Sequence, residues 1–192
     1  MSKKYSEKDN VKTLMKASYE SAKDARNTLR NAGYTLDQQL SNINTKVFTD
    51  QMGKPHITFR GSVRAVDWLR DDPLIELGLG RFAPRVKEAQ RITKQVEAKY
   101  GQKADVFGNS LGGALAERSG AGGKIVTHNK AVALTDIGKT IPKNQIDIRS
   151  IQDPVSVLSL TQKHKGRFVN TVPVMGLVDS HLYTALPNGL FV

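Results

Sequence analysis

The chain has 192 residues, 39% of them hydrophobic and 24% charged, which is enough to bury one sizeable core in an ordinary globular domain. The absence of cysteine excludes a disulfide framework, a thiol nucleophile and a thiolate metal site. The formal net charge of +11 favours polyanionic partners, nucleic acid or an anionic membrane, although a solvated basic surface would explain this charge equally well.

Targeting signals are not visible in the sequence. The N-terminal residues are basic but lack the apolar core of a signal peptide, and no run approaches the roughly 20 apolar residues of a transmembrane helix. We therefore expect a soluble, cytoplasmic chain without a transmembrane segment. Because no linker or repeat divides the chain, we expect a single domain over 1–192, with 1–44 as an N-terminal helical accessory segment within it.

The first predicted element is a helix over 7–31, in which apolar residues recur every three or four positions until Gly33 stops it. Two short strands follow within 46–60, around a turn that contains Gly53 and Pro55. This pattern predicts a β-hairpin.

The middle of the chain alternates between the two types of element. A short helical or irregular segment over 63–73 precedes a long helix over 84–100. An apolar strand over 104–108 then runs directly into a helix of small residues over 110–120, and a further strand covers 123–129.

The last third predicts strands and loops. An alternating strand begins at Gln145 and breaks at Asp153-Pro154, and the tail, 168–192, offers one or two short strands and a loop that carries His181. Strands alternating with helices predict an α/β domain with a mostly parallel central sheet and flanking helices.

Residues 108–112 read G-N-S-L-G and place Ser110 where the strand passes into the helix. A nucleophile elbow requires this context, because its strained turn needs small neighbours, here Gly108 and Gly112. The N–H of Leu111, at the helix N-terminus, would then stabilise an oxyanion. The plainer alternative is a tight turn in which Ser110 caps the helix.

A catalytic triad on such a sheet follows the chain order serine, acid, histidine. Of the four histidines, His56 precedes Ser110 and lies in a strand, so we expect a structural role. His128 ends the strand next to the serine, with no strand between them to present an acid, and His164 lies in a basic loop that we expect to be solvated. His181 follows the last predicted strand and has the right place for the base.

The acid that best fits the same order is Asp153. It follows an apolar strand that Pro154 ends, so it would lie at a strand's carboxyl end, where open α/β sheets gather their sites. Asp136 lies in a loop, Asp147 lies along a strand, and Asp179 is too close to His181 to orient it well. Asp153 as a turn residue and His181 as a partly buried polar residue remain the simpler alternatives.

Two spaced motifs resemble the class 3 lipases, the fungal triacylglycerol lipase family of α/β-hydrolases. Residues 57–72, ITFRGSVRAVDWLRDD, resemble the family's F-R-G-[ST] strand end, its tryptophan-containing lid and its W-[IL]-x-D motif. Residues 106–117, VFGNSLGGALAE, resemble its G-H-S-L-G-G-A elbow. QDPVSVLS resembles the D-P-V-P segment at the triad acid, and SHLYTAL shows a weaker similarity to the histidine region. The resemblance covers about 45–185.

The resemblance implies roles for further residues. Ser62 would be the first oxyanion-hole residue, through its N–H and hydroxyl, Leu111 would be the second, and Asp71 would hold the Ser62 hydroxyl. The segment from Val63 to Pro73 would be a lid over the substrate. Its expected substrate-facing residues are Val63, Val66 and Trp68.

The sequence also departs from the family pattern. Asn109 replaces the usual histidine before the nucleophile, and Arg81 replaces the second glycine of the H-x-G-F stretch. The chain is shorter than the fungal enzymes and has no disulfides. Segments such as LSNINTKVF are similar to compact lipase-like proteins of large DNA viruses and virophages, which suggests a viral, virion-associated protein.

These observations predict a serine esterase or lipase that requires no metal or cofactor. Ser110 would attack the ester carbonyl, His181 would act as base and Asp153 would orient it. The basic surface favours phospholipid or acylglycerol at an anionic lipid interface. The alternatives are a non-catalytic lipid- or protein-binding module and a basic nucleic-acid-binding protein. The 6% aromatic content and the lack of a nucleic-acid motif speak against specific nucleic-acid binding.

Overall fold

The computed structural model describes residues 10–62, 83–171 and 181–187. In chain order the elements are α1 (Asn10–Ala17), α2 (Ala22–Asn31), β1 (Thr35–Asp37), β2 (Thr45–Thr49), β3 (Pro55–Phe59), α4 (Ala83–Tyr100), β4 (Asp105–Asn109), α5 (Leu111–Arg118), β5 (Ile125–His128), β6 (Thr140–Ile141), β7 (Gln145–Ser150), β8 (Lys163–His164) and β9 (Arg167–Thr171). Three 3₁₀ turns complete the set: η3 (Leu134–Asp136), η4 (Val155–Thr161) and η6 (Tyr183–Ala185).

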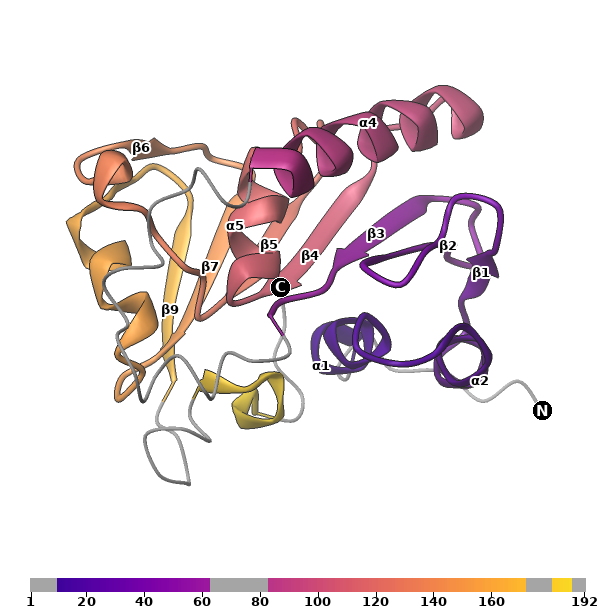
Figure 1. The fold of residues 1–192 in the computed structure, drawn as a ribbon, viewed down its shortest axis with the longest axis horizontal. Coiled ribbons are helices and arrows are strands. Elements are labelled where there is room, and N and C mark those ends of the chain that lie inside the picture. The colour runs from indigo at the N-terminus through magenta and orange to yellow at the C-terminus, as the bar shows by residue number, and fades with distance from the viewer. Residues whose placement is uncertain (1–9, 63–82, 172–180, 188–192) are drawn as a thin grey trace.

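A seven-stranded sheet forms the centre of the molecule, with the strand order β1-β2-β3-β4-β5-β7-β9 (Figure 1). The pairs β1–β2 and β2–β3 are antiparallel, and every pair from β3 to β9 is parallel. The predicted α/β fold with a mostly parallel central sheet and flanking helices is therefore confirmed. Because β4 and β7 run parallel, the residues that follow them emerge at the same edge of the sheet.

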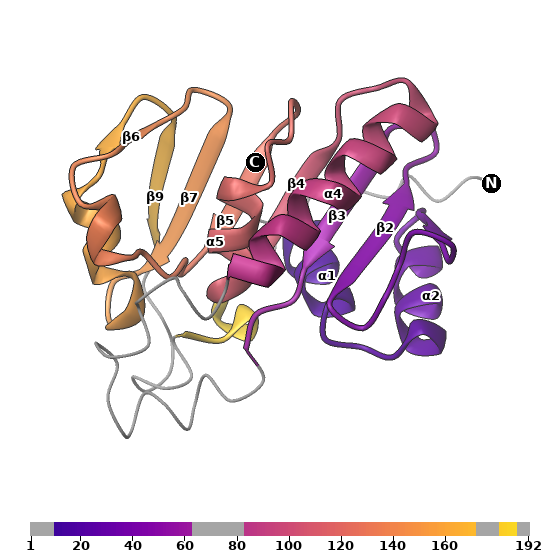
Figure 2. The same ribbon diagram turned by 45° about the horizontal axis from the view of Figure 1, so that its top comes forward.

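Helices cover both faces of the sheet, so the fold has three layers (Figures 1 and 2). On one face α4 and α5 enclose a core that includes Ile57, Ile92 and Leu115. On the other face α1 and α2 pack over a second core, with Leu14, Phe48 and Val126 among its members. The short-period alternation along the strands produces this division, because successive side chains point to opposite faces.

The predicted single helix over 7–31 is wrong, because the chain breaks between α1 and α2. The Ser18 hydroxyl donates to the carbonyl oxygen of Met15 (2.7 Å) just after α1 ends. Ser21 then caps α2 by accepting a hydrogen bond from the N–H of Asp24 (3.2 Å). Both helices bury an apolar side on the same sheet face, so the apolar periodicity runs through the break and conceals it.

The other regular elements agree with the sequence to within a few residues. The predicted hairpin corresponds to β2 and β3, with Gly53 in the left-handed region (φ +80°) at the turn, and the predicted long helix is α4. The short strands β1, β6 and β8 were not predicted, because two or three residues give too little alternation to detect.

Candidate active site

Ser110 lies on the sharp turn between β4 and α5 with φ 57° and ψ −125°, in the left-handed region that non-glycine residues rarely adopt. Small neighbours permit this turn. A Cβ added to Gly108 would lie 2.1 Å from the carbonyl oxygen of Gly112, and one added to Gly112 would lie 2.2 Å from that of Phe59. The Ser110 side chain makes no capping hydrogen bond to the described part of α5, so the simple N-cap interpretation is wrong.

Ser110, His181 and Asp153 form a chain of hydrogen bonds across three separate segments. Ser110 Oγ lies 2.8 Å from His181 Nε2, and His181 Nδ1 lies 2.8 Å from Asp153 Oδ1. All three side chains are buried. Because the carboxylate accepts from Nδ1–H, the neutral imidazole presents an unprotonated Nε2 to the serine hydroxyl, which is the tautomer that a general base needs.

The second carboxylate oxygen of Asp153 is held by the backbone. Asp153 Oδ2 accepts from the N–H of Ser156 (2.8 Å), in the first turn of η4. Burial alone would raise the pKa of Asp153, but hydrogen bonds from His181 and Ser156 and the charge of His181 together lower that pKa below its ordinary value. The carboxylate therefore stays ionised at neutral pH and favours a positive charge on the imidazole.

Of the predicted oxyanion donors, Leu111 directly follows Ser110, and Ser62 directly follows a residue that lies beside it. Leu111 is the first residue of α5, so its N–H has no acceptor within the helix. The chain after β3 passes beside the elbow, because a Cβ added to Gly61 would lie 3.5 Å from Ser110 Cβ. Ser62, the next residue, is half-buried. The predicted lid and supporting residues Val63, Val66, Trp68 and Asp71 lie outside the described residues.

A buried network beneath Ser110 was missed by the sequence reasoning. Asn109 Oδ1 accepts from His128 Nδ1 (2.6 Å), so His128 Nε2 is free to accept from Ser150 Oγ (3.4 Å), which in turn accepts from Asn129 Nδ2 (3.2 Å). Burial, and then repulsion from the nearby His181, lower the pKa of His128 to about 3. A neutral His128 therefore supports the elbow, and Asn109 has a structural role beside Ser110.

Tyr19, from the turn after α1, connects three parts of the site. Its phenol oxygen accepts from Asn109 Nδ2 (3.3 Å) and from the backbone N–H of Gly61. Its ring stacks on Tyr183, two residues after His181, with the ring centroids 5.3 Å apart. The accessory helices thus contact the elbow, the strand end before Ser62 and the histidine loop at one point. No local motif marks Tyr19, which lies 90 residues before Asn109.

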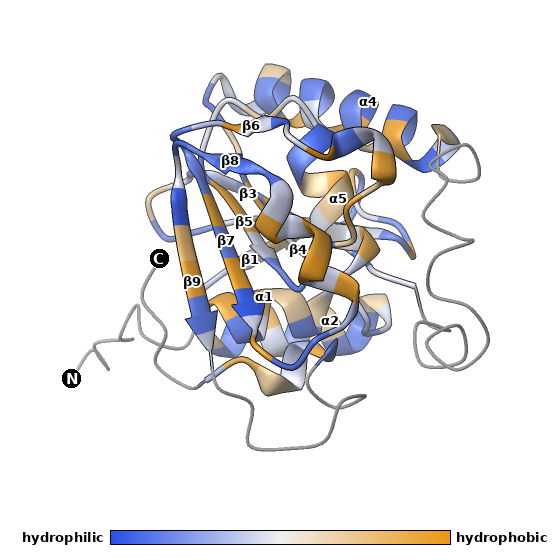
Figure 3. Ribbon diagram, turned by 90° about the vertical axis from the view of Figure 1, so that its left-hand side faces the viewer, coloured by the Kyte–Doolittle hydropathy of each residue, from blue (hydrophilic) through white to orange (hydrophobic). Residues whose placement is uncertain are grey.

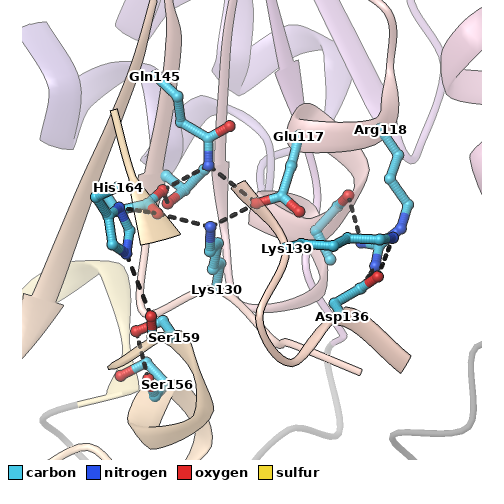
Figure 4. A network of polar contacts seen from close by, with 12 residues as sticks. Glu117, Arg118, Lys130, Asp136, Lys139, Gln145, Ser156, Ser159 and His164 are labelled. Atoms are coloured by element: carbon cyan, nitrogen blue, oxygen red, sulfur yellow. Dashed lines mark hydrogen bonds and ion pairs between the residues drawn. The ribbon is translucent and has the colours of Figure 1, made fainter. Parts of the chain in front are cut away.

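The other candidate acids and histidines belong to structural contacts. Asp147 binds Lys130 Nζ (2.6 Å) in the network shown in Figure 4 and lies 3.6 Å from His164 Nδ1. The expectation of a solvated His164 is wrong, because its side chain is only 16% exposed and the preceding Lys163 pairs β8 with β6. Asp136 pairs with Arg118 and Lys139.

His56 pairs with Asp50 at the far end of β3, in agreement with a structural role. Asp179 lies outside the described residues. Within 10–62, 83–171 and 181–187 there is no cluster of three or more side chains suited to hold a metal ion. None of the helices in those ranges is both long and apolar enough to cross a membrane.

Comparison with known proteins supports the fold. No protein-family model matches the chain, and no curated protein sequence matches it either. Among solved structures, a mutant form of MDLA from Penicillium cyclopium is similar with a TM-score of 0.51 at 16% identity, over 89% of this chain and 81% of that one. The chain therefore has a lipase-like α/β fold.

Two structures of the Rhizomucor miehei lipase propeptide complex are also similar. The native form has a TM-score of 0.40 at 16% identity, and a deletion mutant has 0.39 at 18%. In both, 76% of this chain is covered, and the chain spans about 60% of the length of the native form. These fungal neighbours give no support to the resemblance to viral proteins.

Proposed function

We propose that the protein is a serine carboxylic-ester hydrolase that acts on lipid esters. One observation carries the proposal: hydrogen bonds of 2.8 Å each connect Ser110 to His181 and His181 to Asp153. Ser110 lies on a strained turn directly before the N-terminus of α5. The constellation recurs on unrelated folds and is recognised by the geometry and roles of its members.

In the proposed first half-reaction, Ser110 Oγ attacks the ester carbonyl while His181 Nε2 takes the hydroxyl proton. The resulting imidazolium is stabilised by Asp153, which stays ionised because its pKa is lowered and accepts the hydrogen bond from Nδ1–H. His181 then donates its proton to the leaving alcohol. The product of this step is an acyl-enzyme on Ser110.

The charge on the carbonyl oxygen needs donors placed in advance. The N–H groups of Leu111 and Ser62 would supply them, and the dipole of α5 would add to the effect. Each such donor contributes about 3 kcal/mol to barrier lowering in comparable sites. Water, activated by His181, would complete the second half-reaction by hydrolysing the acyl-enzyme.

The substrate class that we propose is acylglycerol or phospholipid. The net charge of +11 favours esters presented at an anionic lipid surface over small neutral esters in solution. The family resemblance of the elbow and of the F-R-G-S strand end points to the same class.

Hydrolysis of p-nitrophenyl esters of graded chain length tests the proposal, with wild type compared against Ser110→Ala. We expect the variant to lose at least about 10⁴-fold in kcat/KM. Ser119→Ala is the matched control, because it removes another buried serine from the opposite end of α5. Wild-type activity that survives in Ser110→Ala would reject the triad.

Fluorophosphonate labelling provides a second readout that needs no turnover. Wild type should label on Ser110 and Ser119→Ala should label equally. A folded wild type that neither labels nor hydrolyses any ester would instead support a non-catalytic binding module.

A further inference from the structure

The exposed charges between residues 130 and 171 are all of one sign. The three acidic residues of this stretch are buried: Asp136, Asp147 and Asp153. The exposed charged side chains are all basic: Lys139, Lys143, Lys163, Lys165 and Arg167. Asp136 is paired with Arg118 and with the exposed Lys139, and Asp147 with the buried Lys130, so the net charge that this stretch exposes is positive and attracts anions.

The same stretch carries most of the exposed apolar side chains. Among the described residues seven large hydrophobic side chains are exposed, and five of them lie here: Leu134, Ile137, Ile151, Val157 and Leu160. Single exposed apolar residues are common on protein surfaces, but a concentration of them in one region indicates an interaction site.

The pairing of β6 with β8 holds together the two segments that carry most of these residues, one containing η3 and the other η4. The N–H of Gly138 donates to the carbonyl oxygen of Thr161 (3.1 Å), and the N–H of Lys163 donates to that of Lys139 (2.9 Å). Ile137 and Leu160 therefore flank one hydrogen bond, with two lysines at the next one. We call this region the η3–η4 surface. It consists of four exposed aliphatic residues and three exposed lysines: Leu134, Ile137, Val157, Leu160, Lys139, Lys163 and Lys165. Figure 3 shows the molecule from the side on which η4 and the β6–β8 pair lie.

Packing of η4 does not require the exposed residues. Its inward side is formed by Val155, Ser156 and Ser159, which are buried. Val157 and Leu160 point away from that side, and Leu160 is 54% exposed. The apolar exposure is thus additional to what the fold needs, at a 3₁₀ turn whose Ser156 N–H also holds Asp153.

We propose that the η3–η4 surface docks the protein onto an anionic membrane. Insertion of aliphatic side chains at the boundary between headgroups and acyl chains stabilises the bound state, and each lysine near an anionic leaflet adds electrostatic attraction. A nucleic acid would be attracted by the lysines but would leave the aliphatic side chains in water. Docking through η4 brings the segment that follows Asp153 to the lipid, so it deepens the proposed function by naming the source of the substrate.

Vesicle co-sedimentation tests this surface, with phosphatidylcholine vesicles prepared with and without phosphatidylserine. All proteins carry Ser110→Ala, so that the vesicles stay intact whatever the activity. Ile137→Asp combined with Leu160→Asp should weaken binding to the anionic vesicles more than about tenfold. Met52→Asp is the matched control, because Met52 is 91% exposed on the β2–β3 turn, outside the surface.

A second variant tests the charge separately. Lys163→Glu with Lys165→Glu should also weaken anionic binding by more than about tenfold, and salt should weaken wild-type binding in the same way. Circular dichroism confirms that each variant is folded. Unchanged vesicle binding in both folded variants would overturn the proposal, and so would a wild type that binds DNA but neither vesicle type.

The two proposals fail separately. Hydrolysis of a soluble short-chain ester by the Ile137→Asp/Leu160→Asp variant, with Ser110 retained, should match wild type, because neither residue belongs to the site. If wild type binds anionic vesicles but hydrolyses no ester, the docking surface stands and the catalytic proposal fails. If wild type hydrolyses esters and the variants bind vesicles as wild type does, the catalytic proposal stands and the docking surface fails.

Discussion

Two buried polar clusters lie on opposite faces of β5, one residue apart along the strand. His128 belongs to the cluster beneath Ser110, whereas Thr127 donates to Asp147 Oδ1 (2.6 Å) in the charged network of Figure 4. Strand alternation alone separates them. The cluster beneath Ser110 joins neutral side chains, whereas the other network joins charged ones.

The charged network has several contacts to each member. The ammonium group of Lys130 lies 2.5 Å from Glu117 Oε2 and 2.6 Å from Asp147 Oδ2, and Gln145 Nε2 donates to both acids. Burial would raise the pKa of Glu117, but the charge and hydrogen bond of Lys130 lower it below its ordinary value. A single ammonium group thus bridges two carboxylates, and these contacts connect α5, β5 and β7.

The candidate site is instead a linear chain with one bond per link and a strained serine at its end. Among the described residues His181 makes one hydrogen bond to Ser110 and one to Asp153, so its Nε2 can take the serine proton while the ionised Asp153 accepts from its Nδ1–H. The comparison suggests a general distinction: branched networks with several contacts per residue hold elements together, whereas linear hydrogen-bonded chains that end on a strained residue are suited to chemistry.

Exchange of one acid in the candidate site and of one in the charged network should test the comparison most strongly. Asp153→Asn places an amide opposite His181 Nδ1 and favours the wrong tautomer, so kcat should fall by about 10⁴-fold, or roughly 5 kcal/mol in the barrier. Asp147→Asn, in the other cluster, should leave kcat of the folded protein within about threefold. Turnover of a short-chain p-nitrophenyl ester measures both, and similar losses would contradict the division.

Changes in the charged network should alter stability rather than activity. Lys130→Met leaves two buried carboxylates without a cation, and the free energy of unfolding should fall by about 3–5 kcal/mol. Urea unfolding measures the change, with Lys94→Met, on the exposed side of α4, as the control. Addition of Glu117→Gln and Asp147→Asn to Lys130→Met should recover part of the loss; no recovery would show that packing, not charge, holds the network.

The neutral His128 predicts a pH dependence of stability with a defined sign. Its folded pKa, about 3, lies below the ordinary value of 6.5, so between these values the unfolded chain binds a proton that the folded chain does not. The free energy of unfolding should thus fall as the pH drops below 6.5, by about 2 kcal/mol at pH 5.

Comparison with His128→Asn isolates this contribution, because Asn can still donate to Asn109 but does not titrate. Urea unfolding at pH 7 and pH 5 should show the extra loss in wild type only. Asp153 does not interfere, since its lowered pKa means that its contribution is lost only as the pH falls below the ordinary value of 3.8. If both proteins lose the same free energy of unfolding between pH 7 and pH 5, His128 is not kept neutral in the folded protein.

The sequence predicted the architecture well because long periodic segments such as α4 and the strand-to-helix passage at Ser110 carry their signal locally. It also predicted Ser110, Asp153 and His181, which the structure joins by hydrogen bonds. The signals were their order along the sequence and the strand end that Pro154 marks after Asp153. It could not reveal Tyr19 or His128. Their roles depend on contacts across the sheet and across 90 residues, which leave no spacing pattern in one sequence.

The smallest expected effect concerns the contact between the accessory helices and the site. Tyr19→Phe removes the acceptor for Asn109 Nδ2 and for the Gly61 N–H, and the free energy of unfolding should fall by about 1 kcal/mol. Because both donors adjoin Ser110 and Ser62, kcat/KM on a soluble ester should also fall, by roughly three- to tenfold. Tyr100→Phe loses a comparable hydroxyl contact, to Asp37 (2.8 Å), far from Ser110. A fall in stability without a fall in activity, as expected for Tyr100→Phe, would make Tyr19 a packing residue only; a fall in both would show that the accessory helices position the site.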